Sequence, residues 1–283
     1  MLVCAMTLFG TIGFFVRHIT LGSGQIALYR AVIAMAVMGL YLLLTKQGIG
    51  LKNPKKQLPL LAFSGVAIGI NWILLFEAYR YTTISLATLS YYFAPVLVTL
   101  VCPVLFREKL TVKQILCFVM STLGLAMITG FGASGRGTDT WGVVLGLGAA
   151  VFYAGAVITN KYIRDVDGMQ RTFWQFSAAV IVLLPYAMFT GGFQLQQLDL
   201  IGWGSLLLVG LVHTGLCYCL YFSALKELPG QKAAILSYID PLVAVVISVT
   251  LLQEKMTFWQ LVGGILILGF TLLNELGPKE KKQ

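Results

Sequence analysis

Long apolar segments alternate with short polar connections along the whole chain. We place ten such segments, at residues 2–18, 25–45, 58–79, 83–106, 111–129, 140–161, 171–189, 200–224, 231–252 and 257–275. A helix of about twenty apolar residues is long enough to cross the hydrocarbon core of a bilayer. The segments are continuous and lack the alternation of transmembrane β-strands. The pattern therefore predicts an all-α polytopic membrane protein with ten transmembrane helices.

Composition agrees with this interpretation, because 58% of the residues are apolar and only 11% are charged. A net charge of +9 would suggest a nucleic-acid partner in a soluble protein. In a membrane protein it is better explained by Lys and Arg gathered in cytoplasmic loops. We therefore expect no nucleic-acid partner. The expected partners are a small-molecule substrate and membrane lipid, with the protein as a monomer or homodimer.

The basic residues also predict the orientation. If both termini are cytoplasmic, fifteen of the 20 Lys and Arg residues fall in cytoplasmic loops. The other five are Arg17, Arg30, Arg80, Arg136 and Lys255. This asymmetry follows the positive-inside rule. We expect an integral protein of a bacterial inner membrane, with both termini in the cytoplasm.

One motif occurs twice. Tyr91-Tyr-Phe-Ala-Pro95 precedes Glu108-Lys-Leu-Thr111, and Ser237-Tyr-Ile-Asp-Pro241 precedes Glu254-Lys-Met-Thr257. The copies are 146 residues apart, and in both copies 13 positions separate Pro from Glu. Prolines at matching places in two apolar halves indicate the binding region of a transporter.

A Gly-rich linker at 131–139 divides the chain into two five-helix repeats, 1–130 and 140–276, followed by a basic cytoplasmic tail at 277–283. Because five is odd, the second repeat must enter the membrane inverted. The loop charges agree with this. Arg107-Glu-Lys-Leu-Thr-Val-Lys113 is basic and expected inside, whereas its twin Gln253-Glu-Lys-Met-Thr-Phe-Trp259 has lost two of three positive charges.

The pattern resembles the EamA-type transporters of the drug/metabolite transporter superfamily. The matching stretches are Ala94-Pro-Val-Leu, Glu108-Lys-Leu-Thr-Val-Lys-Gln, Ala224-Leu-Lys, Ile239-Asp-Pro-Leu-Val-Ala-Val, Glu254-Lys-Met-Thr and Gly263-Gly-Ile-Leu-Ile-Leu-Gly269. The resemblance implies two inverted five-helix repeats around a central cavity. It further implies transport of small organic solutes, often the export of amino acids or related metabolites.

Asp240 lies about halfway along the ninth predicted helix, where a charge costs about 2.5–3.5 kcal/mol. One explanation is structural: Asp240 would cap a half-helix that restarts at Pro241. The other is functional: the carboxylate would face the cavity and bind a cationic substrate group or a proton. We further expect Pro95 and Pro241 to break their helices where these line the cavity.

Polar and aromatic residues at mid-span complete the predicted binding site, because a ligand cavity usually combines aromatic faces with a few polar groups. The candidates besides Asp240 are Asn71, Trp72, Tyr91, Tyr92, Tyr153, His213, Tyr218, Ser237 and Tyr238. Each of them is also compatible with simple packing. Arg30 and Glu77 lie at similar depth and are expected to form a structural or gating ion pair, unless Arg30 extends to the surface.

No metal or cofactor site is expected. The two histidines and five cysteines are not spaced as metal ligands, and no nucleophile–base set is recognisable. We therefore expect a secondary transporter that works by alternating access, is not an enzyme, and carries an amino acid or similar metabolite. Export is the expected direction, and the sequence leaves open whether transport is coupled to protons or proceeds by facilitated diffusion. The alternatives are uptake or exchange of nucleoside-like or drug-like solutes, and a non-cycling channel or sensor.

Overall fold

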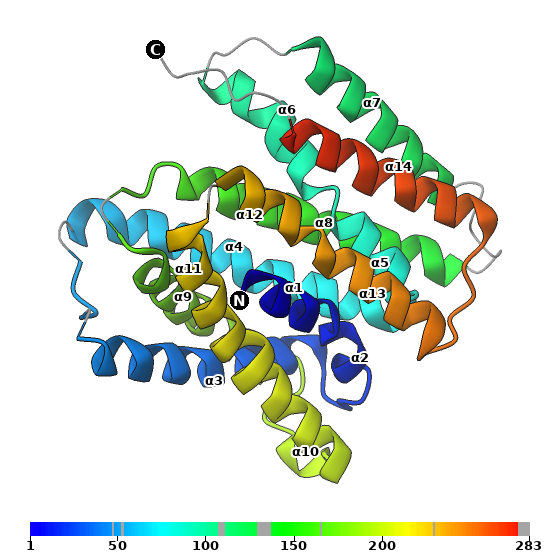
Figure 1. The fold of residues 1–283 in the computed structure, drawn as a ribbon. Helices are drawn as coiled ribbons and strands as arrows, with labels where there is room; N and C mark the ends of the chain where they lie inside the picture. Colours follow the sequence, from blue (N-terminus) through cyan, green and yellow to red (C-terminus); the bar gives the residue numbers. More distant parts are fainter. Residues whose placement is uncertain are drawn as a thin grey trace.

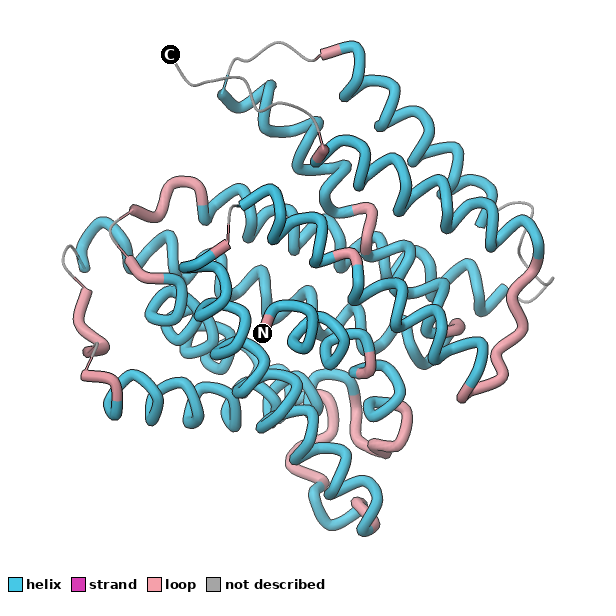
Figure 2. Tube along the Cα trace, viewed as in Figure 1, coloured by secondary structure: helices cyan, strands magenta, loops and turns pink. Residues whose placement is uncertain are grey.

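The computed structural model describes residues 1–46, 48–51, 54–106, 111–128, 137–164, 166–228 and 230–276. In this part of the chain, all regular structure is helical, as Figure 2 shows. Glu108, residues 131–136 of the predicted linker and the basic tail at 277–283 lie outside the described residues. The helices begin and end close to the bounds predicted from the hydropathy pattern.

Six helical segments in the described residues are long and apolar enough to cross a membrane: Ser23–Leu44, Lys55–Tyr81, Ile84–Cys102, Thr140–Asn160, Gly168–Phe189 and Leu200–Ala224. Shorter apolar helices cover Leu2–Val16, Val112–Ala126, Ile235–Thr250 and Phe258–Asn274. An all-helical chain with this many apolar spans has the architecture of a polytopic membrane protein.

Helices α3 (Ser23–Leu44), α4 (Pro54–Tyr81), α8 (Gly137–Asn160) and α9 (Gly168–Phe189) form the main packed body. Helix α4 packs against α8 and α9, and α3 packs against α9 (Figure 1). Small residues allow these close approaches: a Cβ on Gly65 would lie 2.3 Å from the carbonyl oxygen of Gln175. The backbones of α4 and α9 thus approach each other closely, as is common between membrane helices.

Helices α7 (Val112–Ala126) and α14 (Phe258–Glu275) pack side by side at the top of Figure 1 and run in opposite directions. Gly124 and Gly263 meet at their crossing, where a Cβ on Gly124 would lie 2.6 Å from the carbonyl oxygen of Gly263. Each helix starts with a capping box, formed by Thr111 with Gln114 and by Thr257 with Gln260. The Glu-Lys-x-Thr motifs therefore include the helix caps.

Several apolar segments are interrupted. Helix α1 (Leu2–Gly10) is separated from α2 (Ile12–Val16) at Thr11, and α5 (Ile84–Tyr91) from α6 (Ala94–Phe106) at Tyr92 and Phe93. Helix α12 (Gly230–Ser237) is separated from α13 (Ile239–Thr250) at Tyr238. Another long segment contains α10 (Leu200–Leu207), a π-helical stretch, η3 (Leu208–Leu216), and α11 (Cys217–Glu227). The breaks at Thr11, at Tyr92 and Phe93, and at Tyr238 lie beside residues that line one cavity.

Candidate binding cavity

The cavity has a volume of about 600 Å³ and is lined by residues of α1, α2, α3, α4, α5, α6, α8, α9, α11, α12 and α13. At one end its wall includes Gly13 and Thr88, and at the other it reaches Asn160 and Arg171, near the ends of α8 and α9. A cavity of this size suits a small organic molecule.

The helix breaks lie next to the predicted prolines. Helix α5 ends just before Tyr92, three residues ahead of Pro95, and α12 ends just before Tyr238, three residues ahead of Pro241. A proline cannot donate to the preceding turn, so the helix ends there and restarts. Helices α5 and α13 pack against each other, and the rings of Tyr92 and Tyr238 have centroids 6.4 Å apart. The two breaks thus meet in the cavity wall.

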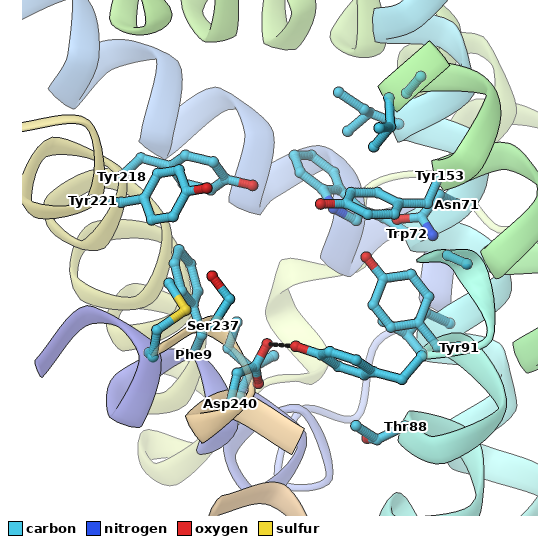
Figure 3. A pocket seen from close by; sticks show the side chains of 18 of the residues that line it. Phe9, Asn71, Trp72, Thr88, Tyr91, Tyr153, Tyr218, Tyr221, Ser237 and Asp240 are labelled. Carbon is cyan, nitrogen blue, oxygen red and sulfur yellow. Dashed lines mark hydrogen bonds between the residues drawn. The ribbon is translucent and has the colours of Figure 1, made fainter. Parts of the chain in front are cut away.

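Asp240 faces this junction. The Tyr92 hydroxyl donates a hydrogen bond of 2.6 Å to Asp240 Oδ2, shown by the dashed line in Figure 3. Asp240 belongs to the first turn of α13, and the residue at the cap position, Tyr238, makes no side-chain cap. Asp240 therefore lies in the cavity lining and is not at the cap position of α13.

Aromatic residues supply most of the remaining lining. The rings of Tyr91, Tyr153, Tyr218 and Tyr221 project into the same space, with hydroxyl groups directed inward (Figure 3). Tyr91 also packs against Tyr153, with ring centroids 5.4 Å apart. Hydroxyl-tipped rings of this kind offer a flat apolar surface with a few hydrogen-bonding groups at its edge.

Two of the polar side chains predicted for the site, Asn71 and Ser237, already donate hydrogen bonds to backbone carbonyl oxygens. Asn71 Nδ2 donates to the carbonyl oxygen of Ala149 at 2.8 Å, which ties α4 to α8. The Ser237 hydroxyl donates to the carbonyl oxygen of Ala233 at 2.9 Å. Trp72 is buried and packs edge-on against Phe176. All three predicted residues line the cavity, but Asn71 also fixes two helices together.

The predicted pair between Arg30 and Glu77 is wrong. Glu77 contacts Arg80 instead, at 3.5 Å. Arg30 is 5% exposed and lines the cavity; its Nε donates to Thr214 Oγ1 at 2.6 Å. Its guanidinium carbon lies 4.5 Å from the centroid of the Trp72 ring. Depth along the helices suggested the pair, but depth does not tell which face of each helix a side chain occupies.

His213 is absent from the cavity lining, contrary to its predicted place in the binding site. Its Nδ1 contacts the carbonyl oxygen of Leu208 at 3.0 Å, and its Nε2 lies 2.6 Å from Thr11 Oγ1. His213 therefore joins the π-helical stretch to the break between α1 and α2. The sequence offered little warning of either irregularity, because neither contains a proline.

A polar cluster missed by sequence reasoning lies near the Thr88 end of the cavity. We call it the latch: Arg17, Thr82, Ile84, Ser248 and Glu254. Arg17 Nη2 contacts Glu254 Oε1 at 2.7 Å and donates to the carbonyl oxygen of Thr82 at 2.8 Å. Glu254 Oε2 accepts from the Ile84 amide at 2.9 Å and from the Ser248 hydroxyl. The latch ties the end of α2 to the start of α5 and to the loop after α13.

The fold and the cavity together define a class: a polytopic helical membrane protein with an internal, solute-sized binding space between broken helices. The profile of the EamA-like transporter family matches residues 1–130 and again residues 140–275. The chain belongs to this family, and its members named below are transporters rather than enzymes.

An uncharacterized transporter of Bacillus subtilis, YxxF, is 30% identical over 98% of this chain and 89% of its own length. An uncharacterized transporter of Archaeoglobus fulgidus is 27% identical over 96% of this chain and 94% of its own. A probable biotin transporter of Pseudomonas aeruginosa is 24% identical over 91% of both chains. One solved crystal structure has the same fold, with a TM-score of 0.66 at 16% identity over 95% of this chain and 93% of that one.

Proposed function

We propose that the protein is a secondary transporter that exports a small zwitterionic metabolite, such as an amino acid, by alternating access. The observation that carries this proposal is Asp240, a carboxylate held by Tyr92 among aromatic rings where two broken helices meet. A carboxylate in such a cavity would bind the ammonium group of the substrate. The rings would enclose its apolar part.

We further propose that the shorter apolar helices also cross the membrane, giving ten spans in two inverted repeats with both termini in the cytoplasm of a bacterium. The two separate family matches, to 1–130 and 140–275, support this arrangement. The packing supports it as well. The pairs α3–α9, α5–α13 and α7–α14 each join corresponding helices of the two halves, as a two-fold axis in the membrane plane requires.

Alternating access requires a cavity that is closed on one side and open on the other. The latch lies at one end of the cavity, and we place it on the outer face because Glu254 follows the ninth proposed span. The other end reaches Asn160 and Arg171, beside the loop after the sixth proposed span, on the cytoplasmic face. If the latch closes the outer end and the other end opens to the cytoplasm, this conformation would receive a substrate from the cytoplasm, as an exporter must.

Proton coupling through Asp240 is part of the proposal, since a carboxyl group can hold either a proton or the substrate's ammonium group. Competition between these two ligands would exchange one proton for one substrate. The name of the biotin-transporter relative gives a second candidate substrate class, a carboxylate that carries no ammonium group.

Counterflow tests the proposal. Purified protein in liposomes loaded with unlabelled amino acid should transiently accumulate the labelled compound above equilibrium. A channel passes solute without counterflow, and an absence of saturable exchange for amino acids and for biotin alike would contradict the proposed carrier. The Asp240→Asn variant is the matched control, because it keeps the side-chain shape and removes the charge.

A further inference from the structure

The cavity contains a second charged group, Arg30, that the proposal above leaves unused. It is almost fully buried, and a buried guanidinium normally has an anionic partner. Within the described residues, no carboxylate oxygen lies within the 4.0 Å limit of an ion pair with Arg30. The predicted partner, Glu77, is engaged by Arg80. The charge of Arg30 thus lacks a protein counter-ion in contact with it.

The orientation of Arg30 is fixed from two sides. Its Nε donates to Thr214 Oγ1, and Thr214 in turn donates to the carbonyl oxygen of Val209 at 2.7 Å, five residues earlier in the π-helical stretch. Its flat face lies over the Trp72 and Phe76 rings, at 4.5 Å and 5.4 Å from their centroids. No hydrogen bond from its two terminal nitrogens is found among the described residues, although Arg30 lines the cavity.

The charges of the cavity wall also favour an anionic group on the substrate. Among the described lining residues, the charged ones are Arg30, Arg171 and Asp240, which gives an excess of positive charge. A purely cationic substrate would meet net repulsion in this space. The carboxylate of a substrate would neutralise the excess positive charge of the cavity wall. The two oxygens of a carboxylate also match the paired N–H donors of a guanidinium.

Arg171 is the competing candidate, but its surroundings differ. Arg171 is only half-buried, near the start of α9, and interacts electrostatically with Asp167 of the same helix end. Arg30, in contrast, is almost fully buried and has aromatic faces on one side and the cavity on the other. Of the two guanidinium groups, that of Arg30 is therefore the one that is buried, fixed in orientation and directed at the cavity.

We infer that Arg30 is the carboxylate-binding residue of the cavity, and that every substrate of this transporter carries a carboxylate. This inference rests on the proposed transport function and narrows its substrate class. The substrate's carboxylate would bind the terminal nitrogens of Arg30, while Asp240 receives the ammonium group when one is present. Amines, amides and uncharged drug-like solutes are excluded as substrates.

The test is a binding comparison on the purified full-length protein by isothermal titration calorimetry. Four probes share a phenyl ring: L-phenylalanine, 3-phenylpropanoate, L-phenylalaninamide and phenethylamine. Wild-type protein should bind the two carboxylates roughly 10- to 100-fold more tightly than the amide and the amine. This ratio of dissociation constants corresponds to the free energy of hydrogen bonds to a charged group. Equal affinity for all four, or binding of no carboxylate, overturns the inference.

Variants locate the site. Arg30→Gln should abolish the preference for carboxylates, and Arg30→Lys should keep part of it, since the charge remains but the paired donors do not. Arg30→Lys is also the control if Arg30→Gln fails to fold, because it keeps the positive charge at this position. Arg80→Gln, which alters an exposed guanidinium, should behave as wild type. Loss of the preference in Arg171→Gln, or its retention in Arg30→Gln, assigns the carboxylate elsewhere and overturns the inference.

Counterflow of the same probes distinguishes a failure of the binding inference from a failure of the transport proposal. If phenylalaninamide or phenethylamine is exchanged as well as phenylalanine, the protein is a carrier but Arg30 does not select carboxylates. If a carboxylate binds in an Arg30-dependent way but no probe is exchanged, the binding site stands and the transport proposal fails.

Discussion

The two broken helices at the cavity have similar backbones and different chemistry. In both, the break falls at a tyrosine three residues before a proline: Tyr92 before Pro95 and Tyr238 before Pro241. The residue just before proline differs, because the first helix has Ala94 where the second has Asp240. Shared residues thus account for the break, and one unshared residue accounts for the charge. In the proposed transporter, movement would depend on what the halves share and selectivity on what they do not.

The largest expected effect is at the unshared position. Asp240→Asn should lower counterflow of an amino acid by about 100-fold or more, because the substrate's ammonium group loses its charged acceptor. The remaining transport should no longer depend on pH. Adding the acid to the other helix in Ala94→Asp/Asp240→Asn should restore little, because the acid would then lie on the same broken helix as Tyr92 instead of across the junction from it. If transport by the Asp240→Asn variant kept the pH dependence of the wild type, Asp240 would be ruled out as the coupling group.

A second prediction concerns the latch, which contains Glu254 of the second motif. Glu254→Gln should destabilise the protein by about 2–3 kcal/mol, since its side chain is 10% exposed and accepts several hydrogen bonds. Arg17→Gln should cost less, because Arg17 is 35% exposed. Thermal unfolding in detergent measures both, and equal losses would show that the pair acts only through its mutual contact.

Smaller effects are expected when the hydroxyl groups of the tyrosines at the two breaks are removed. Tyr92→Phe removes the hydrogen bond to Asp240 and should change substrate affinity by about tenfold. Tyr238→Phe keeps the corresponding ring but not its hydroxyl, and should change affinity by less than about threefold. The reverse order in a titration of the purified variants would mean that Tyr238, not Tyr92, orders the carboxylate.

The most even effect of the two halves is expected for the prolines. Pro95→Ala and Pro241→Ala each return a backbone donor that can extend the second half-helix across the break. Both should slow exchange by a similar factor of about two to five while leaving equilibrium binding nearly unchanged, because the wall residues stay in place. Exchange rates and binding constants from the same preparation check this. A large loss in only one variant would argue against equivalent hinges.

The helices and both proline breaks were predictable from the sequence, because hydropathy and proline act locally. The pairing of Tyr92 with Asp240 across 148 residues was not, although both residues were chosen as site candidates. Local patterns place a residue along its helix but do not fix the rotation of that helix. That is why Arg30 was matched with Glu77 although its partner is Thr214.

The π-helical stretch added a further difficulty. A π turn holds more residues than an α turn, so side chains beyond it face another direction than a regular helix predicts. This affects His213, which was expected in the cavity but contacts Thr11 behind the wall. The latch was missed for a simpler reason. Glu254 was noticed only as part of a loop motif, and a loop position does not reveal which distant residues its side chain contacts; the cap of the helix that follows is formed by Thr257.

The stacking of Arg30 on Trp72 gives the protein an optical reporter of its own. The chain has five tryptophans, and among the described lining residues only Trp72 belongs to the cavity. A ligand that draws the guanidinium from the indole face would change the emission of this ring, while Trp141, Trp203 and Trp259 are exposed on the outer surface. A variant that keeps Trp72 as its sole tryptophan would therefore report occupancy by fluorescence, without label or radioactive substrate.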